Sequence, residues 1–175
     1  RTSAVAVAVN AAIGGRPCWL SQVLGRSVVD AGGAPPACAD ASFTAERDVA
    51  CVVQAADCLP VLYAARNARA VGAAHAGWRG LAAGVLEAAL DAVTRAAGCG
   101  AADVVVWLGP CIGASAFEVG DEVVQAFGGG PRFVPSASPD GRPRWRGDLP
   151  ALARDRLAAA GVRSIAGGTW CTFSD

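Results

Sequence analysis

Short apolar runs separated by polar breaks dominate the middle of the chain. Residues 49–55 and 58–64 are rich in Val, Leu and Ala, residues 68–76 form a third apolar run, and Arg66 and Asn67 interrupt the series. Runs of this length bounded by a polar turn are typical of β-strands. The pattern therefore predicts an antiparallel hairpin whose turn is centred on the Arg66–Asn67 pair.

This hairpin brings a cysteine close to the only histidine of the chain. With the turn centred on Arg66 and Asn67, Cys58 lies directly opposite His75 on one face of the sheet. Directly opposed residues have Cβ atoms roughly 4.5–5.5 Å apart, which allows a thiolate–imidazole contact or a shared metal ion. If the turn is one residue longer, the pair becomes diagonal.

A glycine-rich turn and a helical pattern follow His75. The turn, HAGWRG, contains Gly77, Arg79 and Gly80. Apolar residues then recur with a 3.6-residue period, at Leu81, Val85, Leu86, Ala89, Leu90 and Val93. A helix start of this kind exposes unpaired backbone N–H groups that bind anions, and the Arg79 guanidinium can add a bidentate contact to a phosphate. Cys58, His75 and Arg79 thus form one candidate site, with Gly77 and Gly80 as candidate substrate-binding residues.

The other apolar segments predict an alternation of strands and helices. We expect strands at residues 18–23, 27–29, 104–108, 132–134 and 163–165, and helices at residues 119–127 and after an Asp148 cap with Pro150 in the first turn. Residues 4–14 fit the start of either a strand or a helix. Because at least one strand pair is a hairpin, we expect an α/β fold with a mixed sheet.

Two further stretches carry polar or reactive side chains. Asp40 and Thr44 lie in a polar segment before the hairpin, where local capping and turn bonding is the favoured explanation and a place at the edge of a site is the alternative. The loop at residues 109–113 ends a predicted strand. Loops at strand ends often carry binding residues, so Cys111 in that loop is a candidate substrate-binding residue.

Composition excludes several classes of function. The chain has 175 residues, enough for one domain with a full core, and it carries 15 acidic and 15 basic residues. A neutral balance without a basic run argues against nucleic acid as the main partner. No stretch is apolar enough for a transmembrane helix and no signal peptide is recognisable, so we expect no membrane partner. The chain begins at Arg1 without any methionine, so we expect that its ends are trimmed. The oligomeric state is not indicated.

The cysteines indicate a reducing compartment. There are seven, an odd number without CxxC pairs, which is typical of free thiols in a cytoplasmic protein. For most of them we expect the role of a small buried hydrophobic residue. Cys58 is the exception, because it follows Asp57 and faces His75.

Several motifs resemble one family in order and spacing. They are QVLG, ADCLPVL, HAGWRGLAAGV, LGPCIGASAFEVGDEV, DLPALARDRLAAAGV and a closing CT, and they run from Pro17 to Thr172. They resemble the multicopper polyphenol oxidase or laccase-like domain family, now better described as metal-dependent purine nucleoside phosphorylases. The resemblance implies a single-domain α/β/β/α sandwich with mixed sheets. It also implies glycosyltransferase activity, in which phosphate cleaves adenosine, inosine, guanosine or methylthioadenosine, and in some members adenosine deaminase activity.

The resemblance further implies a metal ion, zinc or alternatively copper, held by two His and one Cys. The Cys matches Cys58 and the second His matches His75. The first His belongs to the family's QVHG motif, and this chain has Leu24 there. Leucine cannot bind a metal, and two protein ligands are fewer than the usual three of a catalytic zinc site. Another donor, for example Cys111, is needed to replace the missing one.

Three functions therefore stay open. The first is a phosphorylase with Cys58, His75 and Arg79 in the site and with purine nucleoside and phosphate as substrates. The second is a non-catalytic relative that binds a nucleoside or a partner protein after loss of the metal. The third is a metal-free thiol hydrolase with Cys58 as nucleophile and His75 as base, which ranks last because no residue is identified that orients His75.

Overall fold

A six-stranded mixed sheet forms the centre of the computed structural model, which describes residues 4–33, 38–138 and 141–175. The strand order is β11–β7–β5–β6–β3–β2. The strands are β2 (Val28–Asp30), β3 (Ala41–Thr44), β5 (Leu59–Ala65), β6 (Val71–Ala76), β7 (Val104–Leu108) and β11 (Ser164–Gly167). The inner pairs are antiparallel, and the outer pairs β2–β3 and β7–β11 are parallel. The predicted mixed sheet is confirmed.

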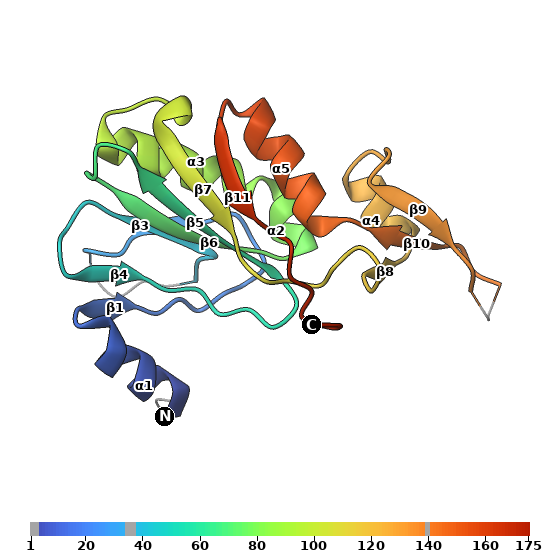
Figure 1. Ribbon diagram of the computed structural model, residues 1–175, viewed down its shortest axis with the longest axis horizontal. Helices are drawn as coiled ribbons and strands as arrows, with labels where there is room; N and C mark the ends of the chain where they lie inside the picture. Colours follow the sequence, from blue (N-terminus) through green and yellow to red (C-terminus); the bar gives the residue numbers. More distant parts are fainter. Residues whose placement is uncertain (1–3, 34–37, 139–140) are drawn as a thin grey trace.

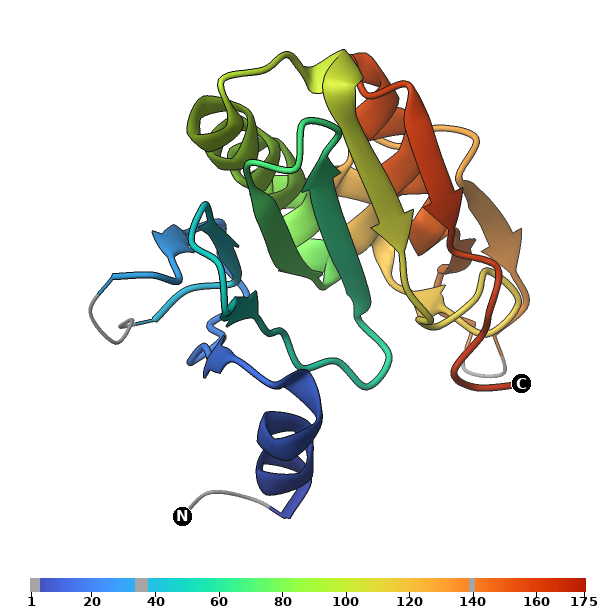
Figure 2. The same ribbon diagram turned by 60° about the vertical axis from the view of Figure 1, so that its left-hand side comes forward.

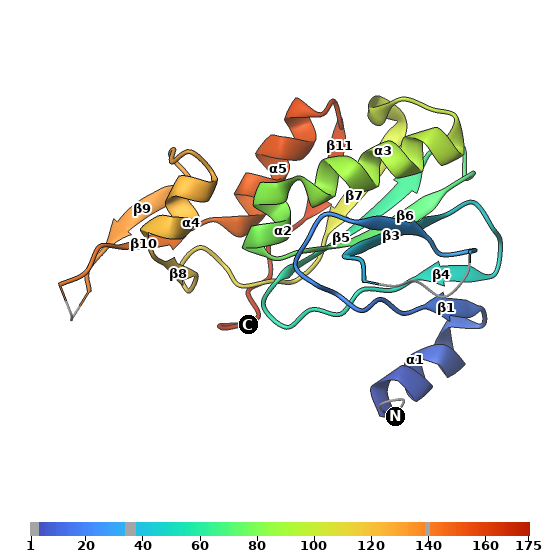
Figure 3. The ribbon, with the colours of Figure 1, turned by 180° about the vertical axis from the view of Figure 1, so that it is seen from behind.

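Helices cover one face of this sheet and a second, smaller sheet lies on the other side. The covering helices are α2 (Trp78–Ala83), α3 (Val85–Ala97) and α5 (Leu149–Ala159) (Figure 1). Seen from behind, the parallel strands β1 (Arg16–Cys18) and β4 (Val49–Cys51) lie below the large sheet, with α1 (Ala4–Ile13) beyond them (Figure 3). The order of layers is that of an α/β/β/α sandwich in a single domain. None of the helices in the described ranges is long and apolar enough to cross a membrane.

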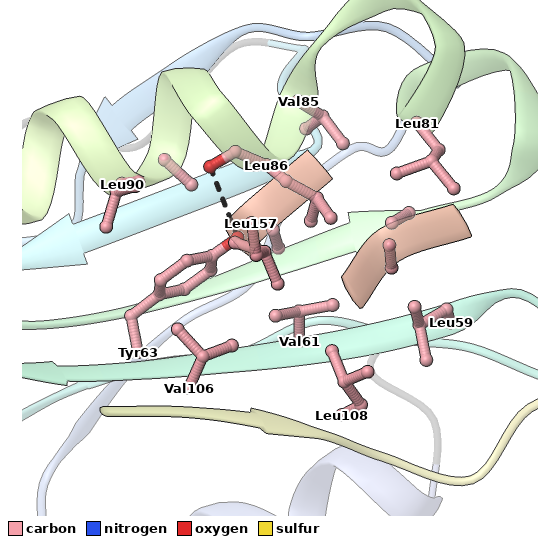
Figure 4. Packing of buried hydrophobic residues seen from close by; sticks show 14 of the residues in the cluster. Leu59, Val61, Tyr63, Leu81, Val85, Leu86, Leu90, Val106, Leu108 and Leu157 are labelled. Atoms are coloured by element: carbon pink, nitrogen blue, oxygen red, sulfur yellow. Dashed lines mark hydrogen bonds between the residues drawn. The ribbon is translucent and has the colours of Figure 1, made fainter. Parts of the chain in front are cut away.

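The core lies between the large sheet and its helices. Along β5, Leu59, Val61 and Tyr63 point toward the helices and are almost fully buried (Figure 4). Leu62, which alternates with them, lies on the other face and is 44% exposed. The Tyr63 hydroxyl donates a hydrogen bond to the Leu86 carbonyl oxygen at 3.3 Å. Full burial of a side chain such as Leu contributes roughly 1.5–3 kcal/mol, so these alternating positions fix which face of β5 meets the helices.

The hairpin of β5 and β6 has a different register from the predicted one. Pro60, not Cys58, pairs with His75, because the turn includes Ala68 in a left-handed conformation (φ 58°) and extends past Asn67. The predicted direct opposition of Cys58 and His75 is therefore wrong. A shift of two residues keeps each side chain on its original face, so Cys58 and His75 still share one face as diagonal neighbours.

The strands before the hairpin also differ from the prediction. The strand expected at residues 18–23 ends at Cys18, where β1 stops. The polar segment of Asp40 and Thr44 includes β3, an interior strand of the sheet, with Asp40, Ser42 and Thr44 buried along one side. Thr44 makes the expected local turn bond, since its hydroxyl oxygen accepts the Glu46 N–H at 3.0 Å, whereas the Asp40 carboxylate bonds only to distant residues. β3 is short and has polar residues at alternating positions, so it shows little of the apolar pattern from which strands are predicted.

The helical elements largely follow the apolar pattern but not its boundaries. The predicted helix after His75 is two helices, because Gly84 adopts a left-handed conformation (φ 95°) between α2 and α3. The short 3-10 helix η1 (Ala101–Asp103) precedes β7. As predicted, Asp148 caps α5, its carboxylate accepting the Ala151 N–H at 2.9 Å.

A small lobe stands at one end of the molecule (Figure 1). Its elements are β8 (Glu118–Val119), α4 (Asp121–Ala126), β9 (Phe133–Ser136) and β10 (Arg144–Gly147). The prediction of one helix over residues 119–127 is wrong at its start, where β8 is found. The prediction of loop over most of residues 128–147 is wrong for β10, which forms the middle strand of the lobe's sheet.

Candidate functional site

Cys58 and His75 border one small space at the end of the large sheet. Cys58 immediately precedes β5 and His75 is the next-to-last residue of β6. A Cβ atom built on Gly77 would lie 2.9 Å from Cys58 Sγ and 3.8 Å from His75 Cε1. The thiol and the imidazole thus face the same point, and the space between them exists because residue 77 has no side chain.

The buried carboxylate of Asp40 holds the His75 ring. Asp40 Oδ1 lies 3.1 Å from His75 Nδ1, and both side chains are nearly inaccessible, at 0% and 5% exposure. The same carboxylate accepts backbone N–H groups from Val23, Leu24 and Gly25 at 3.2, 3.0 and 2.7 Å. Burial acts to raise the pKa of Asp40, but the hydrogen bonds from Gly25, His75 and Leu24 outweigh it, and the pKa is lowered.

The charge of Asp40 fixes the tautomer of His75. An ionised carboxylate only accepts hydrogen bonds, so Nδ1 of the ring carries the hydrogen. Nε2 then keeps its lone pair for a proton or a metal ion. Sequence reasoning found no residue to orient His75, and this prediction is wrong. The sequence signal that could have indicated Asp40 is the alternation of polar residues at Asp40, Ser42 and Thr44, which lie on one side of β3.

The loop that contains Leu24 is held from two sides. Asp40 binds its backbone, as described above, and the Gln22 side chain pairs with the backbone of Gln54, donating to the carbonyl oxygen at 2.8 Å and accepting the N–H at 2.7 Å. Leu24 is 44% exposed and has a left-handed backbone (φ 63°). Its N–H and Nδ1 of His75 bind the same oxygen, Asp40 Oδ1, so position 24 lies beside His75.

The surroundings of Cys58 favour the neutral thiol. Burial of the side chain raises the pKa of Cys58, and the nearby carboxylates of Asp57 and Asp40 raise it further. A thiolate at this position is therefore costly without a cation. This electrostatic setting suits a metal ligand, which loses its proton on binding, better than a free nucleophile.

Arg79 and Gly80 lie in the first turn of α2, directly beyond His75. The Arg79 guanidinium is solvent-exposed and its Cζ lies 4.3 Å from the centre of the Trp78 ring. The helix that begins here, α2, has only six residues, so its dipole is weaker than that of the long helix expected from sequence. Gly80 is buried, and a Cβ there would meet the Gly25 carbonyl oxygen at 2.9 Å. Gly80 thus allows the Leu24 loop to pack against α2.

Cys111 is buried beside the segment that carries Cys58, because the N–H of its neighbour Ile112 donates to the Asp57 carbonyl oxygen at 2.9 Å. It is fully buried within the apolar core, and burial first, then Cys171, raises the pKa of its thiol to about 12. Within residues 4–33, 38–138 and 141–175, no three His, Cys, Asp or Glu side chains form a group that could hold a metal. Cys58 and His75 provide two donors, and the described residues do not fit a three-ligand zinc site.

The end of the chain packs against the segment that carries Cys58. The Thr172 hydroxyl donates to Asp57 Oδ1 at 2.7 Å, and the backbone N–H of Ile112 donates to the Asp57 carbonyl oxygen at 2.9 Å. The Gly113 N–H points at Cys171 Sγ, 3.2 Å away. Figure 2 shows this tail beside the loop that follows β7. The CT motif was part of the resemblance, but no role was assigned to Cys171 or Thr172 from sequence.

Solved structures share this fold. A crystal structure of a Neisseria meningitidis protein aligns with a TM-score of 0.83 at 39% identity and covers 95% of this chain and 68% of its own. The Geobacillus stearothermophilus protein YlmD aligns with a TM-score of 0.77 at 28% identity, over 95% of this chain and 67% of its own. Fold and site together define a mixed-sheet α/β protein with a Cys–His pair at the end of its central sheet.

The family model described as multi-copper polyphenol oxidoreductase laccase matches residues 3–175, and the chain belongs to this family. A purine nucleoside phosphorylase of Pseudomonas aeruginosa is 50% identical over 165 residues, which are 91% of this chain and 65% of that protein. The purine nucleoside phosphorylase YfiH of Escherichia coli is 43% identical over 162 residues, which are again 91% of this chain and 65% of that protein. The chain thus spans 65% of the length of these two curated relatives.

Proposed function

We propose that the chain is the site-bearing part of a purine nucleoside phosphorylase, which transfers the ribosyl group of adenosine, inosine, guanosine or methylthioadenosine to phosphate. The observation that carries the proposal is the Asp40–His75 pair, which faces Cys58 at the sheet end directly before the Arg79 turn. The names of the relatives from Pseudomonas aeruginosa and Escherichia coli support the same reaction class.

In this proposal phosphate binds at the turn after His75. The exposed Arg79 guanidinium and the first N–H groups of α2 hold its oxygens. One phosphate oxygen forms the bond to C1′ of the ribose while the bond from C1′ to the purine nitrogen breaks. Asp40 holds Nδ1 of His75, so in this scheme Nε2 is the ring atom that passes a proton to the departing purine.

A bound metal is a separate part of the proposal. Cys58 and His75 are the donors we assign to zinc, with copper as the alternative. A metal ion on Nε2 of His75 would take the place of the proton in the scheme above and would orient the substrate as a Lewis acid. Because position 24 supplies no donor, no step of the scheme above uses a metal. Deamination of adenosine needs an activated water, so we restrict that activity to forms of the protein in which the metal site has a third donor.

Each of the two rival functions has one observation in its favour. Leu24 at the place of a ligand favours a nucleoside-binding relative without catalysis. Asp40 gives His75 the orienting group that a thiol hydrolase needs, but the raised pKa of Cys58 opposes a reactive thiolate. The phosphorylase is the function that uses Asp40, His75 and Arg79 together.

The test is release of ribose 1-phosphate from adenosine and inosine with and without phosphate. We expect phosphate-dependent release that falls at least about tenfold in His75→Ala, the usual loss for an acid–base group. Arg79→Gln should raise the KM for phosphate, whereas Arg95→Gln, which changes another exposed arginine, on α3, should not. Binding of adenosine without any release would support the non-catalytic relative. Hydrolysis that needs no phosphate and stops on alkylation of Cys58 would support the thiol enzyme.

A further inference from the structure

The carboxylate of Asp57 is held next to Cys58 by segments that lie far away in the sequence. The Thr172 hydroxyl donates to Asp57 Oδ1 at 2.7 Å, and the Ile112 N–H donates to the Asp57 carbonyl oxygen at 2.9 Å. The first of these bonds spans 115 residues. Asp57 is thus oriented by the tail and by the loop after β7, and neither the catalytic scheme nor the metal assignment gives it a role.

Most of the hydrogen-bonding capacity of this carboxylate is unused. An ionised carboxylate has about four lone-pair sites, and within the described residues only Thr172 donates to the side chain of Asp57. No basic side chain in the described ranges forms an ion pair with it. Asp57 is exposed, so the remaining sites are open to a ligand. A carboxylate without a cation beside it accepts hydrogen bonds from hydroxyl groups and repels anions.

Asp57 lies at the same end of the large sheet as the candidate site. β5 is antiparallel to β6 and β7, and β11 is parallel to β7, so the start of β5 meets the ends of the other three strands. Burial raises the pKa of the Cys58 thiol and the charge of Asp57 raises it further, which shows that the carboxylate is close to the thiol. One residue, about 3.8 Å along the chain, separates Asp57 from the position that borders the space in front of His75. A sugar ring is of comparable size.

The proposed reaction generates a charge that a carboxylate stabilises. When the bond from C1′ to the purine nitrogen breaks, positive charge develops on the ribose ring, and hydrogen bonds to the sugar 2-hydroxyl strengthen in transition states of this kind. Dinucleotide-binding folds likewise place an acidic residue on a ribose 2′-hydroxyl. The negative charge of Asp57 also keeps phosphate on the Arg79 side. The base can then stay beside His75, where the proton transfer requires it.

We propose that Asp57, positioned by Thr172, accepts a hydrogen bond from the ribose 2′-hydroxyl and selects ribonucleosides over 2′-deoxyribonucleosides. The ribose lies between Asp57 and the Cys58–His75 space, the purine is next to Nε2 of His75, and phosphate is at Arg79. The inference rests on the proposed function, to which it adds the residue that recognises the sugar. Thr172 is a positioning residue, because its hydroxyl fixes the orientation of the carboxylate and does not touch the substrate.

The experiment compares inosine with 2′-deoxyinosine. Isothermal titration without phosphate gives the Kd of each nucleoside, and release of hypoxanthine after addition of phosphate gives the reaction. We expect the parent chain to bind inosine at least about tenfold more tightly, because hydrogen bonds to a charged acceptor are among the stronger ones. Asp57→Ala should remove this preference by weakening the binding of inosine and leaving that of 2′-deoxyinosine nearly unchanged.

Thr172→Val tests the positioning role. It removes the hydroxyl that bonds to Asp57 and keeps the size of the side chain, so the preference for inosine should become smaller without disappearing. Asp91→Ala and Thr94→Val repeat the two changes on α3, where the Thr94 hydroxyl donates to the Asp91 carbonyl oxygen. Both controls should leave the ratio of the two Kd values unchanged.

The outcomes separate recognition of the sugar from the reaction. The ribose assignment is overturned by equal affinity of the parent chain for the two nucleosides, by no binding of inosine, or by an equal loss for both nucleosides in Asp57→Ala. A preference that depends on Asp57 without any release of hypoxanthine supports the assignment and overturns the proposed function. Release from inosine that is unchanged in Asp57→Ala, together with an unchanged preference, supports the proposed function and overturns the assignment.

Discussion

Cys58 and Gly77 face each other at the open end of the β5–β6 hairpin, and a Cβ atom on Gly77 would lie 2.9 Å from Cys58 Sγ. This separation is shorter than side-chain carbons tolerate. The backbone of Gly77 is ordinary, with φ −63° and ψ 161°, so any residue could adopt it. Glycine is therefore required by the space in front of the thiol and not by the conformation of the chain.

Gly77→Ala tests whether that space is the reaction site. We expect the variant to fold and to lose ribose 1-phosphate release at least about tenfold, because the added methyl group displaces Cys58 and a misplaced group costs that much or more. Gly100→Ala is the matched control, since Gly100 also precedes a helical turn in an extended conformation and its Cβ would meet Asp103 at an ordinary 3.7 Å. Equal activity of both variants would mean that the Cys58–His75 space is not used.

Among the polar groups of the sheet, we expect the Asp40 carboxylate to be the one whose replacement lowers the free energy of unfolding most. Asp40→Asn removes the charge that accepts four hydrogen bonds, and we expect a loss of at least about 2 kcal/mol in the free energy of unfolding. Ser42→Ala, two residues further along the chain in β3, is the control, because the Ser42 hydroxyl is buried and, among the described residues, has no hydrogen-bond partner. Urea denaturation measures both, and Ser42→Ala should be neutral or stabilising.

Asp40 should also affect how the free energy of unfolding changes at acid pH. Its pKa is lowered in the folded protein, so it stabilises the fold above the pKa of the unfolded chain, about 3.9, and this contribution is lost as the pH falls through the folded value. The parent protein should therefore lose more stability between pH 6 and the acid range than Asp40→Asn, by urea denaturation at each pH. Parallel profiles for the two proteins would contradict the assignment.

The register of the hairpin explains why the site could be found from sequence although its geometry could not. The apolar runs located both strands, but Ala68 extended the turn and moved the pairing by two residues. An even shift preserves the face, so the Cys58–His75 neighbourhood survived an incorrect register. The place of Asp40 beside His75 could not be found from the hairpin pattern. Its contact with His75 spans 35 residues and depends on β3, whose buried polar residues hide the strand from an apolar pattern.

Leu24→His should complete a metal site. Position 24 has a left-handed backbone, which histidine adopts more readily than leucine, and its N–H shares Asp40 Oδ1 with His75. We expect zinc content, measured by elemental analysis after dialysis, to rise to about one ion per chain, because three protein donors are the usual number for a catalytic zinc. Val23→His, at an exposed neighbour in the same loop, is the control. A similar gain in both variants would indicate non-specific binding.

Cys111 and Cys171 are neighbours, yet we expect their thiols to differ strongly in reactivity. Cys111 and Cys171 form a β-bridge, yet burial raises the pKa of Cys111 to about 12, whereas hydrogen bonds from Ser174 and from the Gly113 N–H lower the pKa of Cys171. At neutral pH Cys171 therefore carries more thiolate, the form that reacts with iodoacetamide. We expect peptide mass spectrometry after a short exposure to find Cys171 labelled and Cys111 unlabelled.

The exposed Cys38 provides the reference for this labelling. If access alone decides the rate, Cys38, which is more exposed than Cys171, reacts faster, and the advantage of Cys171 is absent. If its hydrogen bonds decide the rate, Cys171 reacts faster than Cys38, and Ser174→Ala slows Cys171 toward the reference because the largest cause of its lowered pKa is removed. Labelling of Cys111 before unfolding would contradict its burial, and with it the packing of Cys171 and Thr172 against Cys111.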